Sequence, residues 1–290
     1  MPIDVLLDTD AYNEIDDQFA IAYLLRSEDK LRCRAVCAAP FHNMKSAGPA
    51  DGMEKSYHEI RKILSLMGRE DLYPQVFRGS ERWLADEKTP VDSPAAREIV
   101  RLAGEYTPGH PLHVVAIGAI TNVASALLMA PDIARNIVVV WLGGHAPHWE
   151  NTYEFNMAGD LAAARVVFLS GVALVQLPCM GVVSEFRTTG PELEYWLRGK
   201  NALCDYLAQN TISEAERYAK GRPWSRVIWD VTAVGWLLDG MTRDHEIPRH
   251  VPNDDFQYEA RPDLPPMRIV WHVDRDRLME DLFRRLGEAA

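Results

Sequence analysis

The residues best suited to chemistry in this sequence are acids gathered near its start. A short apolar run at residues 5–7 is followed at once by five carboxylate side chains, which are Asp8, Asp10, Glu14, Asp16 and Asp17. Crowded carboxylates repel one another unless a cation lies among them or some of them hold a proton. Ca²⁺ and Mg²⁺ are hard cations that prefer such oxygen ligands. The stretch therefore predicts a site for one of these two ions.

The elements around the acids place them in a loop at the end of a strand. Residues 5–7 predict a buried strand, and the apolar segment 19–25 behind the acids predicts a helix. In sheets built from alternating strands and helices, ligands bind at the carboxyl ends of the strands. The acids lie where such a binding site is expected.

Farther along the chain, strands and helices alternate. Strands are predicted at residues 31–39, 76–77, 113–117, 137–142 and 172–177, and helices at 54–67, 95–105, 122–128 and 160–169. This order predicts an α/β fold: a single domain over residues 1–290, with a mostly parallel central sheet flanked by helices.

The last third of the chain departs from this alternation. Residues 188–240 predict a helical cap within the same domain, with a long helix at 201–220. Residues 256–260 and 267–273 predict a terminal hairpin or edge strands, and residues 274–286 predict a closing amphipathic helix.

Composition narrows the class of protein. The chain has 290 residues, 47% of them hydrophobic, which is enough for one large core. Its net charge of −11 argues against nucleic acid and anionic membranes as partners, because both attract basic surfaces. The start of the chain lacks a basic region followed by an apolar stretch, and no apolar segment is long enough to span a bilayer. We expect a soluble cytoplasmic protein that takes a small ligand.

Two known kinds of acidic loop fit this one poorly. An EF-hand counted from Asp8 would need oxygen ligands at Tyr12 and Phe19 and a glycine at Asn13, so that interpretation fails. A phosphatase of the haloacid dehalogenase type also begins with a strand and an Asp-x-Asp pair. It usually continues with a Thr or Val pattern that Ala11-Tyr12-Asn13 does not supply.

A third interpretation fits more of the chain. Asp8-Thr-Asp10 with Asp16-Asp17 and the apolar Phe19-Ala-Ile-Ala resembles the signature of the inosine-uridine-type nucleoside hydrolase family. Further blocks in matching order are similar to that family over roughly residues 3–240. They are Gly68–Asp71 ahead of Val76–Gly79, Ala119–Ala124, Leu142–Gly144, Glu154–Asn156 with Asp160, and Trp229–Ala233.

The resemblance implies a metal site and a mechanism. Ca²⁺ would be held by Asp10, Asp17, Asp230 and a main-chain carbonyl at about Val115, with water and ligand hydroxyls completing its shell. Asp10 would act as general base on a metal-bound water that attacks the anomeric carbon. The sugar hydroxyls would be bound by Asp16, Glu154 and Asn156, and Asp8 would support the loop from behind.

Each of these roles has a structural competitor. A helix cap or a loop-stabilising acid is the alternative for all the acids of the loop and for Asp230, which precedes an apolar helix. Glu154 and Asn156 also suit an exposed loop, and Trp229 suits a core.

Departures from the family pattern bear on the substrate. The loop holds two extra residues around Asn13-Glu14. Trp229 stands where members often place a histidine that protonates the leaving base, and an indole cannot do that. His148 falls where an asparagine often contacts the terminal hydroxyl of the sugar, and residues 40–43, ending in Asn43, replace an expected Gly-Asn. The candidates for a substitute acid are His42, His145, His148, Glu150 and Tyr153.

The resulting expectation is a Ca²⁺-dependent hydrolase that cleaves the N-glycosidic bond of a ribonucleoside or related riboside. Asp16, Glu154, Asn156, His148, Asn43 and Trp229 are its expected substrate-binding residues. The resemblance also implies a homodimer or homotetramer. The alternatives are a glycosidase of the same fold acting on another small sugar conjugate, a non-catalytic riboside-binding protein, and a phosphatase.

Overall fold

The computed structural model describes residues 2–219 and 221–288. An eight-stranded sheet forms its centre, in the order β3-β2-β1-β4-β5-β6-β12-β9. Those strands are β1 (Ile3–Thr9), β2 (Leu31–Ala38), β3 (Val76–Phe77), β4 (Leu112–Ala116), β5 (Ile137–Leu142), β6 (Ala173–Leu177), β9 (Thr242–Ile247) and β12 (Met267–Val273). All neighbours in this sheet are parallel except β12 and β9. The predicted α/β class and mostly parallel sheet are confirmed.

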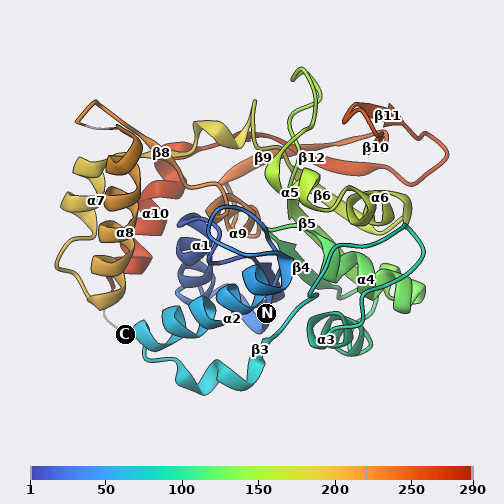
Figure 1. Ribbon diagram of the computed structural model, residues 1–290, viewed down its shortest axis with the longest axis horizontal. Coiled ribbons are helices and arrows are strands. Elements are labelled where there is room, and N and C mark those ends of the chain that lie inside the picture. The colour runs from blue at the N-terminus through green and yellow to red at the C-terminus, as the bar shows by residue number, and fades with distance from the viewer. Residues whose placement is uncertain (1, 220, 289–290) are drawn as a thin grey trace.

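Helices cover both faces of the sheet (Figure 1). They are α1 (Asp16–Leu25), α2 (Pro49–Leu66), α3 (Pro94–Ala103), α4 (Thr121–Met129), α5 (Phe155–Gly159), α6 (Leu161–Leu169), α7 (Gly190–Trp196), α8 (Ala202–Ala219), α9 (Val231–Trp236) and α10 (Arg275–Gly287). Short 3₁₀ turns span Glu70–Gln75, Pro131–Arg135 and Val183–Glu185. Among the described residues, no helix is long and apolar enough to cross a bilayer.

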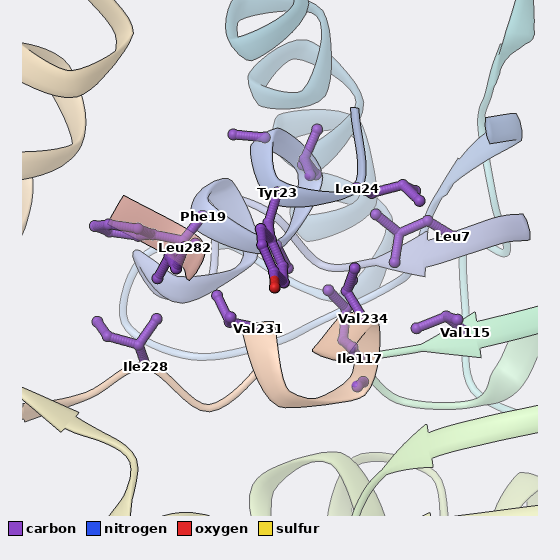
Figure 2. Packing of buried hydrophobic residues seen from close by; sticks show 14 of the residues in the cluster. Leu7, Phe19, Tyr23, Leu24, Val115, Ile117, Ile228, Val231, Val234 and Leu282 are labelled. Atoms are coloured by element: carbon purple, nitrogen blue, oxygen red, sulfur yellow. The ribbon is translucent and has the colours of Figure 1, made fainter. Parts of the chain in front are cut away.

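Two apolar cores follow from this layering. Val5 and Leu7 of β1 face a core shared with α1, α2 and α9, whereas Leu6 faces the core under α3, α4 and α6. Figure 2 shows the first of these cores, with Phe19 and Tyr23 of α1 packed near Val231 and Val234 of α9. A strand that is buried on both faces is apolar throughout, which explains the unbroken run in the sequence.

The end of the chain pairs differently from the prediction. The strand at 256–260 is β11 (Tyr258–Ala260), and it pairs with β10 (His250–Pro252) in a separate two-stranded sheet. β12 instead lies inside the main sheet, between β6 and β9. The prediction left a hairpin or edge strands open for residues 256–260 and 267–273. The two strands do not pair as a hairpin, and β12 is not an edge strand. β9 was missed because it is an edge strand of sequence TRDHEI, whose polar side chains are largely exposed.

The helices predicted at 188–240 are present, but they occupy two places. α7 and α8 lie side by side with α10 at one end of the molecule (Figure 1). β7 (Arg187–Thr188), before α7, and β8 (Arg226–Val227), after α8, pair in a small antiparallel sheet. α9 packs against α1 on the face of the main sheet. The predicted helix 201–220 corresponds to α8, and its last residue, like residues 1, 289 and 290 of the predicted domain, lies outside the described residues.

Candidate active site

A cavity of about 430 Å³ lies at the carboxyl ends of the central strands. Its acidic part comes from the loop between β1 and α1 and from the residue before α9. The rest comes from the segments that follow β4, β5 and β6. Most of the predicted site residues line it, and they are Asp10, Asp16, Asp17, Asn43, Glu154, Asn156, Trp229 and Asp230.

The loop between β1 and α1 is held in one shape by hydrogen bonds. The Asn13 amide donates to the Asp10 carbonyl at 2.7 Å, and the Asn43 side chain donates to the Asn13 side chain at 2.6 Å. Asp16 and Asp17 form the first turn of α1, where the unpaired N–H groups of a helix favour negative charge. Asn13 is thus part of the hydrogen-bonded frame of the loop, and the Glu14 carboxylate accepts a hydrogen bond from Arg226 at 2.6 Å.

The Asp10 carboxylate packs directly against the backbone at Gly118, which has no side chain to exclude it. A Cβ atom added at Gly118, just past β4, would lie 2.8 Å from Asp10 Oδ1. Any larger residue there would push the carboxylate out of place, so the glycine has a steric purpose in this site.

Four carboxylates are buried together here, and they are Asp10, Asp16, Asp17 and Asp230. Burial is the main cause of raised pKa values in all four, and mutual repulsion adds to it for Asp10, Asp16 and Asp230. The pKa of Asp17 rises to about 7, although the Thr9 hydroxyl donates to it and acts in the other direction. Buried charges of one sign call for a partner of the other sign.

The arrangement of these oxygens fits a divalent cation. Asp16, Asp17 and Asp230 each offer a carboxylate oxygen, and those oxygens all lie within 4.8 Å of one another. That span matches ligands on opposite sides of a cation with metal–oxygen distances of about 2.4 Å, as in calcium sites. Asp10 Oδ2 and Asp16 Oδ1 are buried without any hydrogen-bond partner in the described structure, which leaves both oxygens available as ligands. The acidic cluster can therefore bind a metal.

The structure does not bring Val115 to this site. Val115 lies inside β4, paired with Leu7 and Val140, and its side chain packs in the apolar core (Figure 2). Carbonyls inside a parallel sheet are used by the neighbouring strands, whereas those past a strand end are not. β4 ends at Ala116, and Ile117 is the residue that lines the cavity.

Hydrogen bonds to main-chain groups hold the side chains of Glu154 and Asn156 in place. Glu154 accepts hydrogen bonds from the amides of Gly144 (2.8 Å), Asn156 (2.9 Å) and Met157 (3.1 Å), and so caps the short helix α5. The Asn156 side-chain amide donates to the carbonyls of Leu142 (3.0 Å) and Ile117 (3.2 Å). Burial raises the pKa of Glu154, and the amides oppose that shift. Both side chains therefore hold one orientation at the cavity wall.

Other predicted residues lie outside the cavity lining. His148 is exposed, beside Gly181. Asp8 lies beneath the loop, where it accepts a hydrogen bond from Asn122. Asp160, which resembled part of a ribose-binding block, caps α6 by accepting from the Ala163 amide at 3.0 Å.

Sequence reasoning missed part of the wall. Cys179 and Met180 line the cavity, as do Leu142 and Phe155, which lie in blocks that resemble the family but were given no role. The candidate acids His145 and Tyr153 line it too. Cys179 and Met180 follow the end of β6, so the rule that ligands bind at carboxyl ends of strands could have found them.

The sequence matches the family model for inosine-uridine preferring nucleoside hydrolases over residues 5–280. The chain belongs to this family. It is therefore an N-glycosyl hydrolase, and the resemblance noted in the motifs is confirmed. Members of the nucleoside hydrolase family act on small ribosides.

Individual members agree with this assignment. The pyrimidine-specific ribonucleoside hydrolase RihA of Photobacterium profundum is 27% identical over 243 residues, which are 73% of this chain and 76% of that protein. Two solved structures share the fold. The plant nucleoside hydrolase PpNRh1 superimposes with a TM-score of 0.79 at 20% identity over the whole of both chains. The purine-preferring ribonucleoside hydrolase of Gardnerella vaginalis gives 0.76 at 19% identity over 98% of each chain.

Proposed function

We propose that this nucleoside hydrolase cleaves the N-glycosidic bond of a ribonucleoside or related riboside with the help of Ca²⁺, and that Asp10 is its general base. The buried cluster of Asp10, Asp16, Asp17 and Asp230 at the cavity wall carries the proposal, because a cation would stabilise its ionised form and the cluster faces the space for a ligand.

The donor set favours a hard cation. Among the described residues, the acids grouped closely enough to share a cation offer carboxylate oxygens, and no histidine or cysteine belongs to that group. Asp17 and Asp230, two of the three acids whose oxygens lie within 4.8 Å of one another, would hold the ion together with Asp10, and Asp16, the third, would bind the sugar. The Ile117 carbonyl would take the part expected of Val115. A bound Ca²⁺ would lower the pKa of a water molecule in its shell.

Asp10 has the properties of a base for this reaction. Its Oδ2 lacks a hydrogen-bond partner in the described structure, so the oxygen is available to accept a proton from water. Its pKa lies well above the ordinary value because of burial and the charges on Asp17 and Asp16. That shift belongs to the metal-free cluster, because a bound cation would lower the pKa of Asp10 again.

The sugar would lie between the acids and the capped helix. Asp16, Glu154 and Asn156 would bind its hydroxyls, and their negative charge and dipoles would stabilise the oxocarbenium-like transition state of glycosidic cleavage. Asn43 and Trp229 line the same cavity and are proposed to contact the substrate. A homodimer or homotetramer and a cytoplasmic location stay predictions.

The test is release of reducing sugar from a panel of purine and pyrimidine ribosides, before and after chelation and again after Ca²⁺ is restored. Chelator-sensitive release of ribose that Ca²⁺ recovers supports the proposal. Mg²⁺ added in place of Ca²⁺ checks the choice of ion. Release from another glycoside alone supports the glycosidase alternative, release of phosphate supports a phosphatase, and Ca²⁺-dependent riboside binding without turnover supports a binding protein.

A further inference from the structure

The leaving base needs a hydrogen-bond donor, and the cavity has one histidine to supply it. All nine histidines of the chain lie within the described residues, and only His145 lines the cavity. His42 and His148, two of the candidates from the sequence, are exposed outside it. Trp229 also lines the cavity; its indole N–H can donate a hydrogen bond but cannot transfer a proton.

One hydrogen bond sets the tautomer of His145. The main-chain N–H of Met180 donates to His145 Nδ1 at 3.2 Å. A main-chain N–H can only donate, so Nδ1 must be the unprotonated nitrogen of the ring. The neutral imidazole therefore carries its proton on Nε2, and no described side chain accepts a hydrogen bond from it. His145 presents a single N–H donor.

The main chain of His145 is held on both sides. Its N–H donates to Thr152 Oγ1 at 2.9 Å, and its carbonyl accepts from the Tyr258 hydroxyl at 3.2 Å. Tyr258 is fixed in turn by the side chains of Thr152 (2.7 Å) and Gln176 (2.6 Å). These contacts tie the loop after β5 to β6 and β11. The donor is thus positioned before any ligand arrives, which is the condition for effective stabilisation of developing charge.

The position before His145 must be a glycine. Gly144 has a φ of +73°, and a Cβ atom there would lie 2.3 Å from Thr152 Oγ1. Gly144 thereby lets the chain turn so that His145 reaches both Thr152 and Met180.

Burial favours the neutral form of the His145 ring. Burial lowers its pKa below the ordinary value, and this outweighs the nearby carbonyls of Gly144 and Tyr153, which favour the charged ring. A neutral imidazole can polarise an oxygen or nitrogen on which negative charge develops, as triosephosphate isomerase illustrates.

Other donors in the cavity are less suitable. Tyr153 is 64% exposed, and its ring packs on Phe256. The Cys179 thiol is buried beside Glu154, with which it hydrogen-bonds, and burial raises its pKa well above the ordinary value. Neither group combines a fixed position with an unused N–H or O–H.

We propose that His145 is a catalytic residue which donates a hydrogen bond from Nε2 to the leaving base. This inference rests on the proposed function and names the residue that assists departure of the base. The acceptor is a carbonyl oxygen or ring nitrogen of the base, the atoms that gain negative charge as the bond breaks.

Atoms and charges balance in this step. The C–N bond breaks and its electron pair stays on the base nitrogen. Water oxygen bonds to the anomeric carbon and gives one proton to Asp10. The base leaves as an anion held by the Nε2–H donor, and solvent then protonates it and receives the proton from Asp10.

The experiment compares two kinds of leaving group. Uridine and inosine need help to release the base, whereas p-nitrophenyl β-ribofuranoside releases a stable phenolate without it. For His145→Phe we expect kcat/KM to fall about 100-fold on both nucleosides, mainly through kcat, and to stay within about threefold on the nitrophenyl riboside. His145→Gln, which keeps an N–H donor, should recover about tenfold. His272→Phe, an exposed histidine on β12, is the matched control.

The outcomes separate this inference from the proposed function. An equal loss on both kinds of substrate, or no loss on either, would overturn the role of His145 while leaving riboside hydrolysis intact. A wild-type enzyme that cleaves neither nucleosides nor the nitrophenyl riboside would overturn the proposed function itself. Activity on the nitrophenyl riboside also shows that each variant is folded.

Discussion

The side-chain amide of Asn122 donates a hydrogen bond to Oδ1 of Asp8 at 2.7 Å, beneath the acidic loop. Asp8 is fully buried, and its Oδ2 has no partner in the described structure. Burial raises the pKa of Asp8 to about 7, although the Asn122 amide acts in the other direction. Asp8, near the end of β1, therefore has a carboxyl group whose ionisation destabilises the folded protein.

Replacing that carboxyl group should stabilise the metal-free protein. The folded-state pKa of Asp8 lies above the ordinary 3.8, so wild-type stability falls as the pH rises from about 4 to about 7. The amide of Asp8→Asn keeps an oxygen that accepts from Asn122, and it does not ionise as the pH rises. Its advantage in free energy of unfolding should grow by about 2 kcal/mol between pH 5 and pH 7. Denaturant titration in chelator measures this. Asp276→Asn, at an exposed site, is the control, and an advantage that does not vary with pH would contradict the account.

The metal-free protein as a whole should become more stable as the pH falls from 7.5 to 5.5. Asp17 and the other cluster acids hold protons in the folded state that the unfolded chain has released, so folding binds protons in this range. Buried His250 has a pKa lowered to about 4, so the unfolded chain binds its proton first and this residue opposes the trend. The several acids of the cluster outweigh this one histidine. Ca²⁺ competes with those protons, so it should raise Tm more at pH 7.5 than at pH 5.5. Thermal scans with chelator or Ca²⁺ check both slopes, and a Ca²⁺ effect that is largest at pH 5.5 would refute the assignment.

Glu14 should tune the affinity for the cation. It lines the cavity, pairs with Arg226 at 2.6 Å and raises the pKa values of Asp10, Asp16 and Asp17. Glu14→Gln removes one negative charge near the site without changing its shape. Ca²⁺ affinity measured by calorimetry should fall about fivefold. A tighter site in the variant would show that Glu14 serves the ion pair with Arg226 and not the cation.

Trp229→His should improve turnover of poor leaving groups. Trp229 lines the cavity directly before Asp230, so an imidazole placed there would add a proton donor near the base. We expect kcat on inosine to rise about tenfold, with little change on the nitrophenyl riboside. Steady-state rates on the two substrates decide it, and an unchanged rate on inosine would mean that this position does not face the leaving group.

Periodicity and loop chemistry were enough to predict the fold class and the place of the acidic loop. The apolar run of β1 and the apolar helix behind it define the loop locally, so Asp10, Asp16 and Asp17 could be placed without knowledge of the rest. β9 could not be predicted, because its pairing with β12 depends on main-chain hydrogen bonds at an edge where polar side chains face solvent.

The rest of the site depends on where strands end in three dimensions. Val115 and Ile117 lie two positions apart in a uniformly apolar segment. β4 ends at Ala116, so the Val115 carbonyl lies within the sheet and the Ile117 carbonyl lies past its end, and only the structure shows this boundary. His145 and His148 lie three residues apart in one loop. Their different exposures follow from contacts with Thr152, Met180 and Tyr258 that no local pattern reveals.

The most direct test of the mechanism is single-turnover ribose release by Asp10→Asn at saturating Ca²⁺. The substitution preserves size and removes the base. We expect a loss of about 1,000-fold relative to wild type, while calorimetry still detects bound Ca²⁺ and circular dichroism shows an unchanged fold. Turnover within about threefold of wild type would contradict the account, because the water would then be activated without Asp10.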